Sequence, residues 1–385
     1  MKLLKSLALI LSLIMVSSVL AACSKAPTKT TASSKNNRAS KEGLAHDLYE
    51  YTISLEDQVY TLPVPFSEFA KNGWEGTNLD SKKLNPNYLI DETLSKGDIT
   101  ITVIFANFST DILPYSECHV AGVTIDSNQQ NNKAKLLLSN RITFGSSYSD
   151  VKKAYGEAVE ENKNEDYISM YYGTGKYSYY KLSFNKKKLS GIEVRNAVAP
   201  KNFSKGKNDA NTEMPDLVIK YEAPTSLGKD LSSYEFKLDG DLYKLPVPLV
   251  ELEKNGWKLD IDTNEILSAT HIVSGVTLKK GSNAITVDIR NYGTTGAPLK
   301  YCFITSVEYS KDSCQLPIEL PGGISEKSTA EEVIAAYGEP EGNNNISGKT
   351  NILYGSYTSN ALFVFEENKL LELTLNHKLA TIDKN

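Results

Sequence analysis

Apolar and polar residues follow two kinds of pattern along the chain, and the same succession of patterns occurs twice. Each copy opens with alternating residues, over Tyr49–Leu55 and over Tyr234–Leu238, which are typical of a half-buried strand. A second short strand is predicted at Val59–Leu62 and at Leu242–Leu245, after an acidic turn. This order predicts an antiparallel hairpin at the start of each copy.

The clearest internal repeat follows these strands. Residues 62–74 read LPVPFSEFAKNGW, and residues 245–257, 183 positions later, read LPVPLVELEKNGW. The prolines fix φ and lack an N–H donor, so we expect them to end strand pairing and to let the chain leave the sheet. The next residues suit a short helix that Asn-Gly ends. Trp74 and Trp257 follow directly, and we expect both to be buried in the core in equivalent places.

The last third of each copy predicts a second helix and a strand hairpin. Ser147 and Thr329 each precede an acidic residue by three positions, which is the arrangement of a helix N-cap with an acid in the first turn. Each helix is expected to end at the glycine after Tyr155 or Tyr337, and these tyrosines are predicted core residues. Alternating apolar positions then predict strands, including a hairpin over residues 179–196 and its counterpart.

Repeats of this length are domains rather than solenoid turns, because each is long enough to bury its own core. We therefore predict an α+β protein with two tandem homologous domains, each an antiparallel β-sheet with short helices packed on one face. The predicted boundaries are residues 47–196 and 231–380. Residues 197–230, which begin with a run rich in Lys, Asn, Gly and Pro, are predicted to be a linker.

Roughly the last 55 to 60 residues of each repeat carry a family resemblance. The residues that carry it are Gly145, Ser147, Asp150, Val151, Tyr155 and Gly156, and in the second copy Ser328, Thr329, Glu332, Val333, Tyr337, Gly338 and Pro340. This pattern resembles the repeat of the β-lactamase-inhibitor-protein-like fold, shared with small lipoproteins of the outer-membrane assembly type. Ala158 departs from it, since the pattern prefers Pro there. The matched positions are helix caps and core residues, so the resemblance implies a fold rather than an activity.

The half of each repeat that contains LPVP and KNGW is similar to repeat segments of lipoproteins from low-GC Gram-positive bacteria, which carry no agreed activity. The chain is thus expected to be a bacterial lipoprotein with tandem repeats.

Residues 1–22 are predicted to be a lipoprotein signal peptide. Lysines precede a short apolar run over Leu7–Val16, and the tetrapeptide LAAC ends at Cys23. This looks like the lipobox of bacterial lipoproteins, which implies acylation of Cys23, for example with palmitate. The alternative is an ordinary signal peptide with an incidental cysteine. Residues 23–46 are then a polar tether, and the protein is expected on the extracellular side of the cell membrane, held by its lipid.

The composition and charge of the chain exclude some classes of function. The hydrophobic fraction of 40% and the charged fraction of 23% are ordinary for a globular protein. The net charge is −5, and removal of the signal peptide would make it −7 because two lysines are lost. The remaining basic cluster, Lys186–Lys188, falls at a predicted hairpin tip. These features argue against nucleic-acid binding.

Three cysteines remain after Cys23. Cys118 and Cys302 occupy equivalent repeat positions, whereas Cys314 has no counterpart. One prediction is a Cys302–Cys314 disulfide, which an exported protein would allow. The other is that Cys118 and Cys302 are buried strand residues and Cys314 is a loop thiol.

The sequence contains no recognisable catalytic or metal-binding constellation. Its four histidines are scattered without metal-ligand spacing, and no phosphate loop, G-x-S-x-G elbow or CxxC motif is present. We predict no catalytic residue, no metal and no cofactor. Acidic residues are numerous, so a carboxylate-based cell-wall hydrolase stays as an alternative, although nothing singles out a carboxylate pair.

The stretch from Tyr167 to Tyr179 contains more tyrosines than the filling of a core requires. Tyr167, Tyr171, Tyr177 and Tyr179 are predicted ligand-binding residues, because alternation on a strand brings some of their rings to solvent. Tyrosine is also a favoured strand residue, which is the alternative explanation. The predicted function is a non-catalytic, surface-exposed lipoprotein that binds a protein or a glycan of the cell envelope. The fold resemblance implies the alternative of an inhibitor or regulator of an envelope enzyme.

Overall fold

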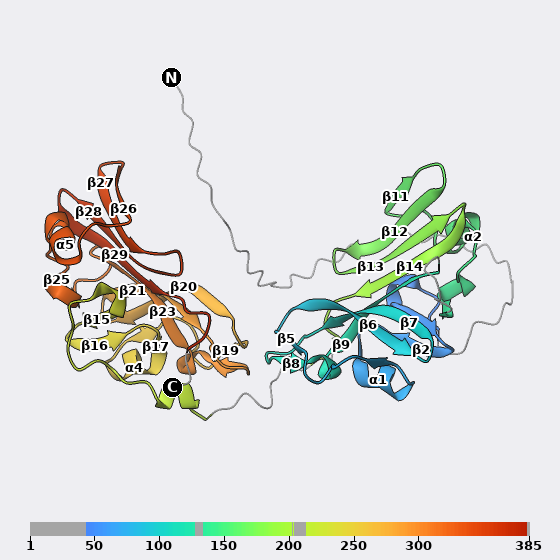
Figure 1. The fold of residues 1–385 in the computed structure, drawn as a ribbon, viewed down its shortest axis with the longest axis horizontal. Coiled ribbons are helices and arrows are strands. Elements are labelled where there is room, and N and C mark those ends of the chain that lie inside the picture. Colours follow the sequence, from blue (N-terminus) through green and yellow to red (C-terminus); the bar gives the residue numbers. More distant parts are fainter. Residues whose placement is uncertain (1–43, 128–133, 202, 204–212, 383–385) are drawn as a thin grey trace, which may run out of the picture. The chain divides into compact units, whose positions relative to one another are not determined.

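The structure is a computed structural model that describes residues 44–127, 134–201, 203 and 213–382. The predicted signal peptide, Cys23 and all but the last three residues of the predicted tether lie outside these described residues. Antiparallel β-sheets and a few short helices make up the described chain (Figure 1). The sequence-based α+β class is therefore confirmed at this level, with strands predominating.

The first repeat forms a large sheet, a small sheet and a two-stranded ribbon, all with antiparallel pairing. The large sheet has the order β11 (Glu160–Lys163), β12 (Tyr167–Gly175), β13 (Ser178–Asn185), β14 (Lys188–Asn196), β9 (His119–Asp126), β7 (Ile99–Ala106), β6 (Leu89–Lys96), β4 (Glu75–Gly76), and β3 (Val64–Pro65) pairs with β9. The small sheet has the order β10 (Leu136–Leu137), β1 (Thr52–Leu55), β2 (Gln58–Thr61), and the ribbon joins β5 (Lys83–Leu84) to β8 (Leu113–Pro114).

The second repeat forms the same kinds of sheet from equivalent segments. Its large sheet has the order β18 (Lys258–Leu259), β20 (Ile272–Lys280), β21 (Asn283–Arg290), β23 (Phe303–Ser310), β29 (Lys369–His377), β28 (Ser359–Glu366), β27 (Lys349–Gly355), β26 (Gly342–Ile346), and β17 (Val247–Pro248) pairs with β23. Its small sheet has the order β16 (Asp241–Lys244), β15 (Glu235–Leu238), β24 (Ile318–Leu320), β25 (Ile324–Ser325), and its ribbon joins β19 (Ile266–Leu267) to β22 (Ala297–Pro298).

The helices are short. They are α1 (Phe66–Lys71), α2 (Tyr148–Tyr155), α3 (Asp216–Ile219), α4 (Leu249–Lys254) and α5 (Ala330–Tyr337). Single 3-10 turns cover Leu48–Glu50, Tyr115–Glu117, Ser139–Arg141, Leu231–Ser233, Leu299–Tyr301 and Pro321–Gly323. No helix within the described ranges is both long enough and apolar enough to cross a membrane.

The predicted helix boundaries agree with the structure. Ser147 and Thr329 are N-caps in complete capping boxes, in which the acid three residues later accepts from the cap's backbone N–H. This arrangement satisfies donors that the first helical turn leaves free. Gly73 and Gly256 follow α1 and α4 with φ of 82° and 88°, a conformation that a residue with a Cβ avoids.

Two details of the predicted opening segment are wrong. The residues around Tyr49 form a 3-10 turn, and β1 begins only at Thr52, because Tyr51 has a left-handed φ of 53°. All four residues of β1 are buried instead of alternating. The proline segments also do not leave the sheets altogether, since Val64 and Val247 begin two-residue strands that pair with β9 and β23.

The buried apolar residues form two large clusters, one within each repeat. The first includes residues from Leu48 to Val194, and the second residues from Leu231 to Leu375. Trp74 and Trp257 are 1% and 0% exposed and occupy equivalent places in the two clusters, as the repeat predicts. Tyr155 and Tyr337, also predicted core residues, are only partly buried and pack against the clusters.

Part of the predicted linker is ordered against the fold. Ala197, Ala199 and Phe203 pack on a small apolar cluster of Ala106, Phe108 and Ala121. Further along, α3 buries Val218 within the same 197–230 segment. Both ends of the described part of this segment therefore contact the fold, which its composition did not predict.

Candidate ligand-binding face

Alternation along β12 separates buried side chains from solvent-facing ones. Ile168, Met170 and Tyr172 are buried, whereas Tyr167 and Tyr171 alternate with them. Because successive strand residues point to opposite faces, Tyr167 and Tyr171 lie on the face away from the core. Tyr171 and Tyr172 therefore lie on opposite faces of the sheet.

The register of the hairpin brings two of the predicted tyrosines into contact. Tyr179 on β13 pairs with Gly173 on β12, two residues beyond Tyr171. The ring centroids of Tyr171 and Tyr179 are 4.9 Å apart with planes inclined by 30°. A Cβ at Gly173 would lie 2.7 Å from the Tyr171 ring and 2.8 Å from the Tyr179 Cβ. Glycine at this position therefore permits the close packing of the two rings.

Charged side chains from neighbouring strands surround the ring pair. The Tyr179 hydroxyl donates to Glu193 on β14 at 2.5 Å, and the Arg195 guanidinium lies 5.6 Å from the Tyr179 ring centroid. Burial, and next the hydrogen bond to Glu193, raise the pKa of Tyr179 well above its ordinary value. Tyr179 thus remains a hydrogen-bond donor over the physiological pH range. Lys181 pairs with Glu193 across β13 and β14, which places opposite charges side by side.

These residues line a shallow groove of about 620 Å³. Its lining consists of Glu160, Asn162, Tyr167, Ser169, Tyr171, Lys176, Tyr179, Lys181, Glu193 and Arg195. Tyr167 is 42% exposed, and its hydroxyl is held by a 2.9 Å hydrogen bond to Ser183 Oγ. We call this set of residues the tyrosine face.

Tyr177, the fourth predicted binding residue, is not in the groove. It lies in the turn between β12 and β13, is 51% exposed, and has the Lys176 ammonium 5.4 Å from its ring centroid. The structure thus brings three of the four predicted tyrosines together. The equivalent turn of the second repeat has an exposed tyrosine as well, Tyr357, at 97%.

The second repeat does not reproduce this face. The strand registers place Leu353, Asn360, Leu362, Thr374 and Asn376 where the first repeat has Tyr171, Tyr179, Lys181, Glu193 and Arg195. Asn376 donates to Asn360 at 3.0 Å in place of the contact between Tyr179 and Arg195. Aromatic rings and charges are therefore specific to the first copy, although the backbone pairing is shared.

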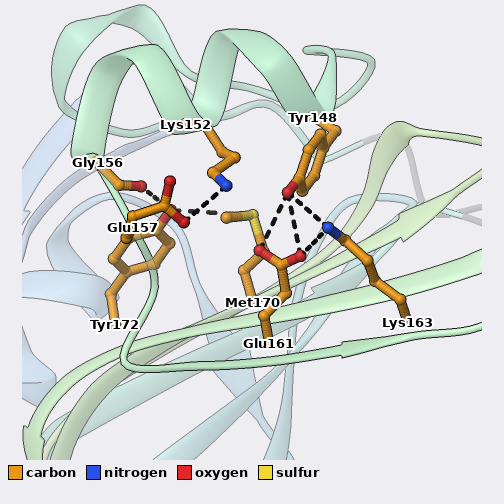
Figure 2. Close-up of polar contacts among 8 residues, drawn as sticks. All are labelled: Tyr148, Lys152, Gly156, Glu157, Glu161, Lys163, Met170 and Tyr172. Atoms are coloured by element: carbon orange, nitrogen blue, oxygen red, sulfur yellow. Dashed lines mark hydrogen bonds and ion pairs between the residues drawn. The ribbon is translucent and has the colours of Figure 1, made fainter.

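A second polar cluster lies between α2 and the edge strand β11 (Figure 2). The Tyr148 hydroxyl donates to the Glu161 carboxylate, with oxygen–oxygen distances of 3.0 and 3.1 Å, and accepts from Lys163 at 2.9 Å. Lys163 also pairs directly with Glu161. The hydrogen bond from Lys163 lowers the pKa of Glu161, and the same bond raises the pKa of Lys163.

These pKa shifts indicate that Glu161 and Lys163 form a structural ion pair and do not act as a general acid or base. A general acid or base works best with a pKa near the operating pH, and here both shifts lead away from neutrality. Lys152 pairs with Glu157 at 2.7 Å, and the Tyr172 hydroxyl donates to the Gly156 carbonyl at 3.0 Å. Figure 2 draws both contacts. The last contact recurs in the second repeat between Tyr354 and Gly338.

The disulfide prediction is wrong. Cys118, Cys302 and Cys314 are all free and buried. Cys302 directly precedes β23, and Cys314 follows the turn after it. An eight-residue strand is about 26 Å long, whereas the Cα atoms of a disulfide lie within about 7 Å. Burial raises the pKa of Cys118 and of Cys302 to about 12, so neither is a reactive thiol.

Within the described part of the chain, no group of three or more His, Cys, Asp or Glu residues is arranged to hold a metal ion. His119, for example, packs against the rings of Phe108 and Phe203, with centroid distances of 5.5 and 5.3 Å, and those two rings also contact each other. It packs as an aromatic residue on a strand.

Sequence reasoning did not identify the charged members of the tyrosine face. Lys181 lies on this face because it is two residues from Tyr179 on β13. Glu193 and Arg195 reach it because of a bulge in the hairpin between β13 and β14. A signal for that bulge exists, since the buried Leu189 and Ile192 are three positions apart instead of two.

A comparison with protein-family models found no match, and comparisons with curated proteins and with solved structures found no significant similarity.

Proposed function

We propose that this protein is a non-catalytic, lipid-anchored binding protein, and that the tyrosine face binds a protein or a polysaccharide of the cell envelope. The observation that carries the proposal is the groove of about 620 Å³ in which Tyr167, Tyr171 and Tyr179 lie among charged side chains on the solvent face of a sheet.

The tyrosine side chains of this face suit binding and are held in place before a ligand arrives. A tyrosine ring offers a flat apolar surface and a hydroxyl, and it loses little side-chain entropy on binding. Here the hydroxyls of Tyr167 and Tyr179 are already held by Ser183 and Glu193, so much of that entropy is lost before any ligand arrives. Lys181 and Glu160 add a donor and an acceptor at the groove for polar groups of a ligand.

The proposal includes a lipid anchor at the N-terminus and a separate domain for each repeat. Cys23 would carry the lipid, and residues 24–46 would tether the folded part to the extracellular side of the membrane. Each repeat would be a domain with its own core, consistent with the two separate clusters of buried residues. Binding would then be a task of the first domain.

The test is retention of the ligand by the chain from Ser24 to Asn385, incubated with envelope extracts and with purified wall polymers. The test variant is the double substitution Tyr171→Ala and Tyr179→Ala. The matched control is Leu353→Ala with Asn360→Ala, at the equivalent positions of the second repeat. We expect the wild type and the control to retain the same ligand and the test variant to lose it.

Equal retention by all three proteins, or none by any, would refute the assignment of the tyrosine face. Protease treatment of the extract separates the two ligand classes, since it removes a protein partner and leaves a polysaccharide. An inhibitor or regulator would retain an envelope enzyme and change its activity. Release of soluble fragments from wall polymer by the wild type would contradict the non-catalytic part of the proposal.

A further inference from the structure

The two repeats build the same three-sided aromatic chamber. Its walls in the second repeat are Tyr234, Tyr337 and Tyr354, and their counterparts in the first are Tyr51, Tyr155 and Tyr172. The ring pair Tyr337–Tyr354 has a centroid distance of 5.7 Å and an edge-on geometry, and so has the pair Tyr155–Tyr172.

In the first repeat the chain fills this chamber with its own side chain. Tyr180 pairs with Tyr172 across β12 and β13, stacks on Tyr51 at a centroid distance of 5.4 Å, and is 1% exposed. Its hydroxyl is close enough to Tyr51, Tyr155 and Asp47 to interact with them electrostatically. Tyr180 therefore occupies the space between these walls.

In the second repeat the occupant is missing. The residue that pairs with Tyr354 is Ala361, so this strand position supplies no ring in place of Tyr180. Tyr234 stacks instead on His377, which does not line the pocket. A cavity of about 320 Å³ remains, lined by Asp230, Tyr234, Tyr337, Glu341, Tyr354 and Ala361. The walls are held without it, because Tyr354 donates to the Gly338 carbonyl at 2.8 Å and Tyr337 donates to the Pro321 carbonyl.

We propose that this cavity is a binding site for a six-membered aromatic ring of phenol size. Apolar cavities bind small aromatic molecules, and here the three tyrosine rings and Ala361 supply the apolar surfaces of a pocket that is partly open to solvent. Its volume lies at the lower end of the range for ligand pockets. The ring comes either from a free small molecule or from a tyrosine side chain of a peptide. The site is independent of the tyrosine face, which belongs to the first repeat.

Charges at the rim select among phenols. Asp230 accepts from Ser232 at 2.9 and 2.7 Å, and Glu341 accepts from the Gly355 N–H at 2.9 Å, so both carboxylates are fixed in place. Lys229 is the one lining residue of opposite charge. A ligand with a cationic group is therefore favoured over one with a carboxylate.

The test is calorimetric titration of the chain from Ser24 to Asn385, which retains every described residue, with tyramine and with 4-hydroxyphenylacetate. We expect one equivalent of tyramine to bind, and 4-hydroxyphenylacetate to bind more weakly. Ala361→Tyr restores the occupant that the first repeat has, so it should abolish binding and raise the melting temperature. Leu362→Tyr is the control, since its side chain is on the opposite face of β28, and it should leave tyramine binding unchanged.

The reciprocal variant Tyr180→Ala opens the chamber of the first repeat and should raise the stoichiometry from one to two. If that variant does not fold, Ala361→Tyr decides alone. Unchanged tyramine binding by Ala361→Tyr, or no binding of tyramine by the wild type at millimolar concentration, would overturn the proposal. Titration with the tripeptide Gly-Tyr-Gly amide distinguishes the sources: binding supports a peptide side chain, and tyramine binding without it supports a free small molecule.

Discussion

Tyr234 stacks on His377, with ring centroids 4.2 Å apart and planes inclined by 14°. The imidazole Nδ1 is also 3.0 Å from the Ser359 hydroxyl. In the first repeat the matching position is Asn196, which accepts from Ser178 at 2.8 Å. The polar pair is thus shared by the repeats, whereas the titratable ring is specific to the second.

This difference predicts an effect of pH on stability. Burial, and next the charge of Lys244, lower the pKa of His377 below its ordinary value of 6.5. The unfolded chain therefore binds a proton on His377 more readily than the folded protein does. The contribution of His377 to the free energy of unfolding is fully present above pH 6.5 and is lost as the pH drops through the lowered pKa of the folded state. His377→Asn copies the first repeat and should reduce the loss of stability between pH 7 and pH 5, measured by urea unfolding.

His119 serves as the internal reference, because burial lowers its pKa too and it is unchanged in both proteins. The variant should thus retain part of the pH dependence. Identical slopes for the wild type and His377→Asn would show that His377 is not coupled to folding.

The capping boxes predict matched losses in the two repeats. Ser147→Ala and Thr329→Ala each remove a side-chain acceptor from a helix N-terminus and should each lower the free energy of unfolding by about 1 kcal/mol. Lys153→Ala, at an exposed position of α2, should change it by less than about 0.5 kcal/mol. Chemical denaturation of the three variants measures this, and a cap variant as stable as Lys153→Ala would contradict the assignment.

In the first repeat, local sequence patterns predict the faces of the β12 residues and the position of the β13–β14 hairpin, but not the register of that hairpin. Alternation places Tyr171 and Tyr172 on opposite faces, and the paired turn residues Lys186 and Lys187 locate the hairpin. A regular two-residue hairpin would pair Tyr179 with Val194, but the bulge at Ser190 shifts this pairing to Arg195. The positions of Glu193 and Arg195 on the tyrosine face therefore depend on one extra residue, whose effect on register a strict period of two does not predict.

Hydrophobic periodicity does not predict features that depend on contacts between segments distant in the sequence. Tyr180 and Ala361 differ visibly in sequence, but the resulting cavity depends on the walls around Ala361, which come from segments between Asp230 and Tyr354. The disulfide prediction failed for a related reason. Proximity in sequence suggested a bridge between Cys302 and Cys314, whereas an extended strand separates the two thiols.

Three buried thiols predict a simple outcome of thiol titration. In the chain from Ser24 to Asn385, Cys118, Cys302 and Cys314 are buried, and burial raises the pKa of each. The folded protein should therefore react only slowly with Ellman's reagent at pH 8. In guanidinium chloride three thiols per chain should react at once. A count of one would show that two of the cysteines are bridged.

Two tryptophans in equivalent places provide a reporter for each repeat. Trp74→Phe leaves only Trp257, and Trp257→Phe leaves only Trp74, so fluorescence follows one cluster at a time. In both proteins the remaining tryptophan should emit at short wavelength and resist quenching by iodide, because it is 0% or 1% exposed.

These reporters test whether the repeats fold as separate domains. Phe184 and Phe365 are equivalent core residues, 0% and 1% exposed, and replacing either by Ala should cost about 3–5 kcal/mol in its own cluster. If each repeat is a cooperative unit, Phe184→Ala shifts the denaturation midpoint reported by Trp74 and leaves that of Trp257 in place. Phe365→Ala should do the reverse. Equal shifts of both reporters in either variant would mean that the repeats unfold together, because a single cooperative unit transmits the loss of either core to every probe.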